Sequence, residues 1–188
     1  MSFERVGAGR AWEGRVFSVE VARFRHEDGR VKQREIVRHP GAVAMLAHDG
    51  ERLYLVRQAR EAVDEPALLE LPAGRVEPPE PQLSTARREL AEEIGKGARS
   101  WRHLRSFYSA AGFSDERVHL YLATDLFDVP RVPDGGERIE VCAFPLGRLE
   151  DALAECRDGK TLVGLMLLQR LLARERAQVP RASGERGY

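Results

Sequence analysis

Residues 87–95 read RRELAEEIG, and this stretch decides how the rest of the chain is interpreted. In a helix each residue advances by about 100°, so Glu89, Glu92 and Glu93 fall within an arc of roughly 100° on one face. Like charges at this spacing repel each other by roughly 0.2–0.5 kcal/mol per pair. The three glutamates therefore indicate either a solvated helix face or a face that binds a cation.

Composition limits the classes of protein to consider. The 188 residues carry 30 Lys+Arg and 30 Asp+Glu, and zero net charge disfavours a surface that coats nucleic acid. Cys142 and Cys156 show no CxxC spacing, which is typical of incidental thiols in a reducing compartment. The N-terminus lacks the apolar segment of a signal peptide, and the apolar stretch TLVGLMLLQRLL is too short to span a bilayer. We expect a cytoplasmic protein with no nucleic-acid or membrane partner.

Alternating apolar residues predict two antiparallel hairpins at the start of the chain. Strands over 14–25 and 31–37 flank Asp28-Gly29, with room for a third strand, and such a small sheet needs a partner surface. Strands over 42–47 and 52–58 flank Asp49-Gly50 and are apolar enough for a covered sheet.

The remaining pattern predicts a mixed α/β chain of the α+β type. A long loop containing LLELPAGRVEPPEPQ leads to a helix over 81–94, which starts at Pro81 and stops at Gly95. Strands follow near 103–109, 117–124 and 137–144, then helices over 146–156 and 160–176 and a frayed tail over 177–188. This order predicts a mixed sheet between helical layers.

Eight residues form a spaced pattern, G-x5-E-x7-R-E-L-x-E-E-x-G, around the three glutamates. Its members are Gly74, Glu80, Arg88, Glu89, Leu90, Glu92, Glu93 and Gly95. A solvated helix face needs no glycine and glutamate at fixed distances upstream, so the whole pattern favours a functional site. It resembles the Nudix box, a loop–helix–loop that binds magnesium and a diphosphate. The resemblance implies a Nudix α/β/α sandwich over residues 40–176, with Lys96 at a box position that is normally aliphatic.

The chemistry of a diphosphate explains these residue types. A divalent cation neutralises the phosphates and lowers the pKa of a bound water, and Mg²⁺ prefers hard oxygen ligands. The resemblance implies Mg²⁺, with Mn²⁺ as the alternative, bound by Glu89, Glu92, Glu93 and the carbonyl of Ala73. Gly74 then allows close backbone approach, and Arg88 orients a neighbouring carboxylate.

Segments outside the box resemble ADP-ribose pyrophosphatases over roughly residues 14–170. They are REIVRHPGAVAML, LVRQAR, LLELPAGR, SAAGFSDERVHLYLA and ERIEV. The resemblance implies hydrolysis of ADP-ribose, or of a related nucleoside diphosphate sugar, to a nucleoside monophosphate and a sugar phosphate. It also implies a homodimer in which residues 1–39 are swapped and two subunits build each site.

Further roles follow from this resemblance residue by residue. Arg60 matches an arginine that binds the substrate phosphates, and Arg34 matches one near the substrate that reaches across the dimer. For both arginines a solvated charge at a sheet edge is the alternative. Phe17 lies near a position that stacks on adenine, and core packing is its alternative.

Two loop acids are candidates for the general base. Glu116 lies in GFSDER and Glu137 in GGERIE, where a closing loop could bring a carboxylate to the diphosphate. Glu137 is preferred because it follows Gly135-Gly136, which allow a hinge, and Glu140 is the fallback.

One departure leaves the substrate open. The subfamily usually carries Ser-Pro-Gly where this chain has Ala110-Ala111-Gly112, and the proline marks ADP-ribose preference. The alternatives are a catalytically silent nucleotide sensor and a hydrolase of dinucleoside polyphosphates or nucleoside triphosphates. The complete set of box glutamates argues against a sensor, and the N-terminal hairpin argues against the smaller triphosphate enzymes.

Overall fold

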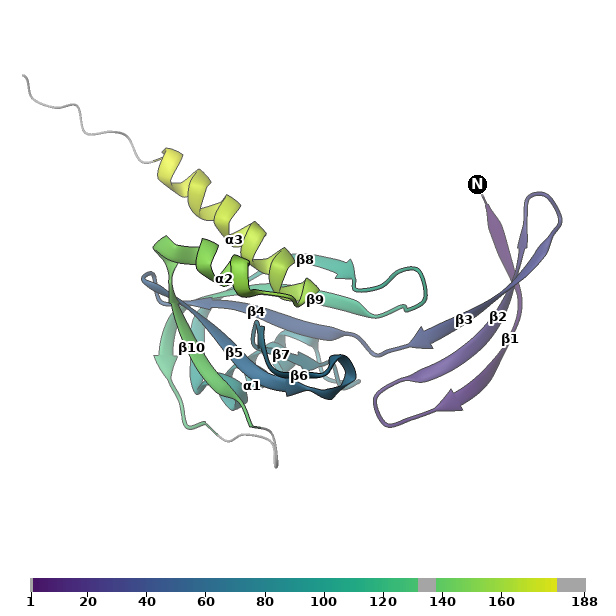
Figure 1. Cartoon of the computed structure of the whole chain (residues 1–188), viewed down its shortest axis with the longest axis horizontal. Coiled ribbons are helices and arrows are strands. Elements are labelled where there is room, and N and C mark those ends of the chain that lie inside the picture. The colour runs from purple at the N-terminus through teal and green to yellow at the C-terminus, as the bar shows by residue number, and fades with distance from the viewer. Residues whose placement is uncertain (1, 132–137, 179–188) are drawn as a thin grey trace, which may run out of the picture.

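The computed structural model describes residues 2–131 and 138–178, which form two β-sheets and three α-helices. The N-terminal sheet contains β1 (Phe3–Glu13), β2 (Ser18–His26) and β3 (Val31–Arg38) in an antiparallel arrangement. It projects from the rest of the chain, as Figure 1 shows. In the described residues no helix combines the length and apolarity that crossing a membrane requires.

The larger sheet is mixed. Its main path has the strand order β10–β5–β4–β9–β8, while β6 pairs with β5 and β7 pairs with β4. β4 and β9 run parallel, and the other strand pairs of this sheet are antiparallel. The strand bounds are β4 (Ala42–His48), β5 (Arg52–Arg60), β6 (Glu65–Glu70), β7 (Ala73–Arg75), β8 (Lys96–Tyr108), β9 (Arg117–Asp128) and β10 (Glu140–Pro145).

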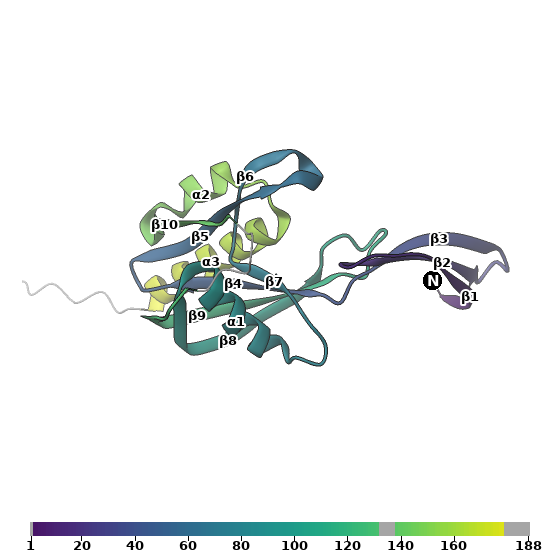
Figure 2. The same ribbon diagram turned by 90° about the horizontal axis from the view of Figure 1, so that it is seen from below.

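Helices cover both faces of this sheet. α1 (Gln82–Ile94) packs on one face, and α2 (Leu149–Glu155) and α3 (Gly159–Gln178) pack on the other (Figure 2). The alternation along β4 explains the two cores, because Val43 and Met45 join the cluster under α1 while Ala44 and Leu46 join the cluster under α3. The expected α/β/α sandwich with a mixed sheet and a small N-terminal antiparallel sheet is confirmed.

Two stretches differ from the sequence prediction. β2 begins at Ser18 rather than residue 14, because Gly14 donates its N–H to the carbonyl of Phe17 (3.0 Å) and closes the turn from β1. The long loop predicted before Pro81 was wrong in its first part. β6 and β7 lie there. β6 pairs with β5, the strand directly before it, and β7 pairs with the more distant β4.

The end of α1 lies where the sequence predicted it, at Gly95, whose left-handed φ of 65° is the glycine conformation expected at a helix end. Other boundaries shift by a few residues. β8 starts at Lys96, earlier than expected, because it pairs with β9 along its whole length. A short 3-10 turn, η2 (Leu146–Arg148), precedes α2, so that helix begins later than predicted.

An ion-pair network fixes the N-terminal sheet to the β8–β9 loop. Arg38 binds Glu20 of β2 (3.0 Å) and Asp115 of the loop (2.8 Å). Val37 donates its N–H to the carbonyl of Phe113 at 2.8 Å. Hydrogen bonds from Arg5 and Arg38 lower the pKa of Glu20 from 4.5 to about 2, so this carboxylate stays ionised at neutral pH.

Candidate active site

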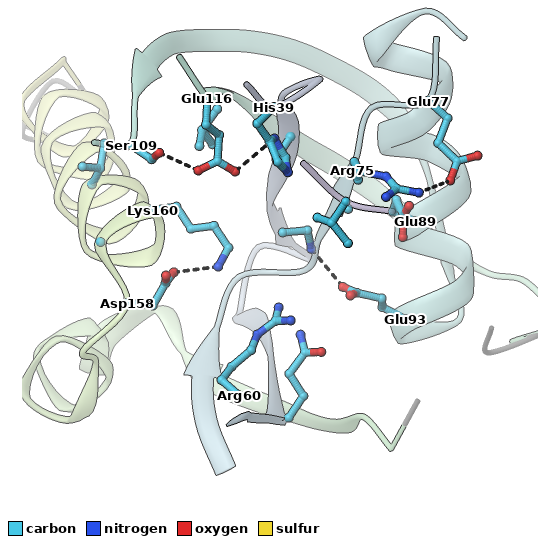
Figure 3. Close-up of a pocket in the computed structure, with 18 of the residues that line it drawn as sticks. His39, Arg60, Arg75, Glu77, Glu89, Glu93, Ser109, Glu116, Asp158 and Lys160 are labelled. Carbon is cyan, nitrogen blue, oxygen red and sulfur yellow. Dashed lines mark hydrogen bonds and ion pairs between the residues drawn. The ribbon is translucent and has the colours of Figure 1, made fainter. Parts of the chain in front are cut away.

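A cleft of about 930 Å³ lies between α1, the β8–β9 loop and the start of α3 (Figure 3). It collects most of the site residues predicted from the sequence. Those that line it are Arg60, Ala73, Gly74, Arg88, Glu89, Glu92, Glu93 and Glu116. Five of the eight residues of the spaced pattern therefore line one cavity, namely Gly74, Arg88, Glu89, Glu92 and Glu93.

Glu93 ties the helix to the neighbouring strand. Its side chain comes from the last turn of α1 and the residue is 4% exposed. Its Oε2 accepts a hydrogen bond from the N–H of Ala73 at 2.9 Å. The helix carboxylate and the backbone of β7 therefore form one wall of the cleft.

Gly74 lies directly against Glu89. A Cβ built at Gly74 would stand 1.9 Å from Cδ of Glu89, far inside any allowed contact. Any side chain at residue 74 would displace the Glu89 carboxylate, so the sequence requires glycine here for close approach.

Arg88 explains how one helix face tolerates three glutamates. Its Nη1 lies 2.9 Å from Glu89 and 3.0 Å from Glu92, and its Nη2 lies 3.3 Å from Glu80. Burial alone would lower the pKa of Arg88, but these carboxylates outweigh burial and raise it. Thr85 donates a further hydrogen bond to Glu80 (3.0 Å), which holds the start of the box against the helix.

The carboxylate oxygens of Glu89, Glu92 and Glu93 are of the type that a hard divalent cation binds. Their side chains do not point at one common position in this structure. Across residues 2–131 and 138–178, no three His, Cys, Asp or Glu side chains form a group ready to hold a metal ion. Arg88 engages Glu89 and Glu92, and Glu93 faces the N–H of Ala73. Glu89 and Glu92 would have to exchange contacts with Arg88 for contacts with a cation.

The wall opposite α1 carries two basic side chains, each ion-paired with a carboxylate. Arg60 of β5 binds the buried Glu70 through Nε (2.8 Å) and Nη2 (2.7 Å), and Lys160 of α3 binds the same carboxylate at 2.6 Å. Glu70 and Lys160 were not predicted from the sequence. A lone glutamate within the apolar run ALLEL was the available signal, because a buried carboxylate requires a cation.

Glu116 reaches the cleft from the β8–β9 loop. It accepts a hydrogen bond from the hydroxyl of Ser109, and its Oε1 lies 3.5 Å from Nδ1 of His39 (Figure 3). Ser109 and His39 also line the cavity and were not predicted. The side chain of Glu116 is therefore held at the rim of the cleft by Ser109 and His39.

Three predicted residues do not lie in this cleft. Arg34 lines a separate cavity of about 400 Å³ beside the N-terminal sheet. Phe17 is 39% exposed and packs against Trp12, with ring centroids 5.1 Å apart. Phe17 therefore does not pack in the core of the single chain, which was the alternative to its predicted role. Glu137 lies outside the described residues.

Comparisons with known proteins agree with this geometry. The NUDIX domain family matches residues 37–162. The chain is 38% identical over 166 residues to the ADP-ribose pyrophosphatase of Bacillus subtilis (strain 168), covering 84% of this chain and 88% of that protein. It is 36% identical over 163 residues to the methanol dehydrogenase activator of Bacillus methanolicus, with the same two coverages of 84% and 88%.

A solved structure shows the same fold. The crystal structure of an ADP compounds hydrolase superposes with a TM-score of 0.82 at 21% identity, covering 95% of this chain and 98% of that one. The family match spans well over half of the chain, and it includes the strand–helix unit that brings Gly74, Arg88 and the three glutamates into one cleft. The chain therefore belongs to the NUDIX family.

Proposed function

We propose that the protein is a Mg²⁺-dependent hydrolase that cleaves the pyrophosphate bond of ADP-ribose or a related nucleoside diphosphate sugar. The products are AMP, or another nucleoside monophosphate, and a sugar phosphate. The observation that carries this proposal is that one cleft brings the carboxylates of α1 opposite the N–H donors of Arg60 and Lys160. The relative from Bacillus subtilis, named ADP-ribose pyrophosphatase, supports the choice of substrate.

The acidic wall has the donors for the cation. Glu89, Glu92 and Glu93 would hold Mg²⁺, or Mn²⁺ in its place, together with the carbonyl of Ala73. Bound there, the cation would neutralise phosphate charge and lower the pKa of a coordinated water. Arg88 holds Glu89 and Glu92 in place by direct ion pairs, and Arg60 binds phosphate oxygens from the opposite wall.

The general base in this proposal is Glu137, with Glu116 as the alternative. Glu116 accepts a hydrogen bond from Ser109 and lies beside His39, so it is already engaged on the rim. Glu137 is proposed from the sequence, because it follows Gly135-Gly136, which allow a hinge.

We also propose a homodimer in which residues 1–39 are the dimerisation segment. Within strands β1 to β3, Ala22 is the one buried residue, while Phe3 is 68% and Trp12 51% exposed. A sheet with that much exposed aromatic surface needs a covering partner. In such a dimer Arg34 and Phe17 would reach the partner's cleft. Light scattering that shows a monomer, fully active at nanomolar concentration, would contradict this proposal.

A substrate panel tests the function. Hydrolysis of ADP-ribose, ADP-glucose, a dinucleoside polyphosphate and a nucleoside triphosphate is measured with and without Mg²⁺. We expect metal-dependent turnover with ADP-ribose or ADP-glucose as the preferred substrate. Binding of ADP-ribose without any turnover would instead identify a sensor, and preference for the polyphosphate or triphosphate would exclude the proposed substrate class. A cytoplasmic location remains part of the proposal, in keeping with the free thiols of Cys142 and Cys156.

A further inference from the structure

The buried carboxylate of Glu70 holds the two basic side chains, Arg60 and Lys160, on the wall opposite α1. The residue is 2% exposed, and an ionised carboxylate so buried requires charge compensation. Arg60 takes one of its oxygens and Lys160 takes the other. A single buried acid thus holds two cations from distant parts of the chain side by side.

Lys160 is fixed more firmly than a surface lysine. Its Nζ lies 2.6 Å from Glu70 and 3.1 Å from Asp158 Oδ2. Asp158 in turn caps the start of α3, because its Oδ2 accepts hydrogen bonds from the N–H (2.9 Å) and the hydroxyl (2.6 Å) of Thr161. The Thr161 hydroxyl accepts a hydrogen bond from the N–H of Leu71 at 2.8 Å, which joins the helix start to the strand behind Glu70.

The ammonium keeps a donor for a ligand. It has three N–H groups, and in the described part of the chain two carboxylates account for two of them. Lys160 lines the cleft, and Figure 3 shows its side chain and that of Arg60 across the cavity from Glu89 and Glu93. Gln58 lines the same cavity, and its buried Nε2 has no hydrogen-bond partner among the described residues.

We propose that Lys160 binds a phosphate of the substrate, and that Arg60 and the amide of Gln58 complete this subsite. This inference rests on the proposed function, since it assumes a substrate with a diphosphate. The diphosphate would lie between the carboxylates of α1 and the N–H donors of Lys160, Arg60 and Gln58. Its metal-bound oxygens would face α1, and its remaining oxygens would face the donors held by Glu70 and Asp158. A preorganised donor loses little freedom on binding, so it adds affinity at small entropic cost.

The test measures binding without turnover. The non-hydrolysable analogue α,β-methylene ADP-ribose, and separately inorganic pyrophosphate, are titrated by calorimetry in the presence of Mg²⁺. Loss of one charge-assisted contact should weaken binding of the analogue by roughly 10–100-fold in Lys160→Met. Lys160→Arg, which keeps the charge, should bind within about threefold of wild type.

Lys96→Met is the matched control. Lys96 is similarly covered (side chain 23% exposed, against 16% for Lys160) and also pairs with a carboxylate, Asp128, but it does not line the cleft. Its analogue affinity should equal that of wild type. Unchanged affinity in Lys160→Met, or no binding of either probe by wild type, would overturn the proposal. Wild type that binds the analogue and hydrolyses nothing would refute the proposed function and leave the phosphate subsite standing.

A second measurement uses the wild-type protein and so does not depend on a variant that folds. The chain has three lysines, at 32, 96 and 160. In protein labelled with ¹⁵N at the lysine side chains, titration with the analogue should shift the Lys160 ammonium signal and leave that of Lys96 unmoved. A Lys160 signal that stays in place at saturating analogue rules out the contact.

Discussion

Oε2 of Glu93 lies 2.9 Å from the backbone nitrogen of Ala73 and accepts its hydrogen bond. This contact joins the last turn of α1 to the first residue of β7. The carboxylate and the Ala73 carbonyl, both proposed as metal ligands, are thereby held on adjoining elements. Strand and helix must keep their relative position for the site to bind a cation.

Glu93→Gln should abolish most turnover and leave the fold intact. The amide oxygen can still accept the hydrogen bond from Ala73, but the charge that a cation requires is lost. We expect kcat to fall by roughly 100-fold or more, measured across a Mg²⁺ titration with circular dichroism as the check on folding. Activity within about threefold of wild type would remove Glu93 from the metal site.

Gly74→Ala should displace the proposed metal ligand Glu89 by steric clash alone. The new methyl would stand 1.9 Å from Cδ of Glu89, so that carboxylate must turn away. The apparent Mg²⁺ affinity should fall along with kcat. Gly147→Ala is the matched control, because a Cβ there meets nothing within 4 Å, and it should behave as wild type. Equal kinetics for the two variants would show that the position of Glu89 does not matter.

Glu137→Gln tests the proposed general base. Removing a base should lower kcat by roughly 10²–10⁴-fold with little change in KM, because substrate binding does not depend on that proton transfer. Glu116→Gln and Glu140→Gln are measured beside it. If either of those two variants shows the loss while Glu137→Gln remains near wild type, the base has been assigned to the wrong loop.

Acid should weaken the attachment of the N-terminal sheet through Glu20. Hydrogen bonds from Arg5 and Arg38 lower the pKa of Glu20 from 4.5 to about 2. A carboxyl group whose pKa falls on folding stabilises the native state above its unfolded pKa, and that stabilisation is lost as pH falls from 4.5 towards 2. The difference in Tm between wild type and Glu20→Gln should therefore be largest above pH 5 and shrink below pH 4.5. A constant difference across this range would show that the ion pairs contribute nothing.

The sequence could predict the central fold because its signals are local. Alternation along β4 and β5 and the glycine after α1 follow from residues close to one another in the chain. The box residues were also predictable, since a helix and its preceding strand bring Gly74 and Glu89 together at short range.

The parts of the structure that the sequence did not predict depend on contacts between residues far apart in the chain. β7 has three residues, too few for any alternation to show, and it exists because β4 offers it hydrogen bonds. Glu70 and Lys160 meet although 90 positions separate them. The predicted role of Arg34 involves a second chain and that of Phe17 a bound adenine, so the geometry of one unliganded chain tests neither.

The attachment of the N-terminal sheet also has a consequence for how substrate choice can change. Ala111, which replaces the proline typical of ADP-ribose enzymes, lines the cavity that Phe3, Phe24 and Arg34 line from the N-terminal sheet. The loop that carries it is held to β3 by the backbone of Val37 and Phe113. Substitutions in the N-terminal strands can therefore move the β8–β9 loop without touching α1, so a change in the proposed dimer contact would also alter the surroundings of Ala111.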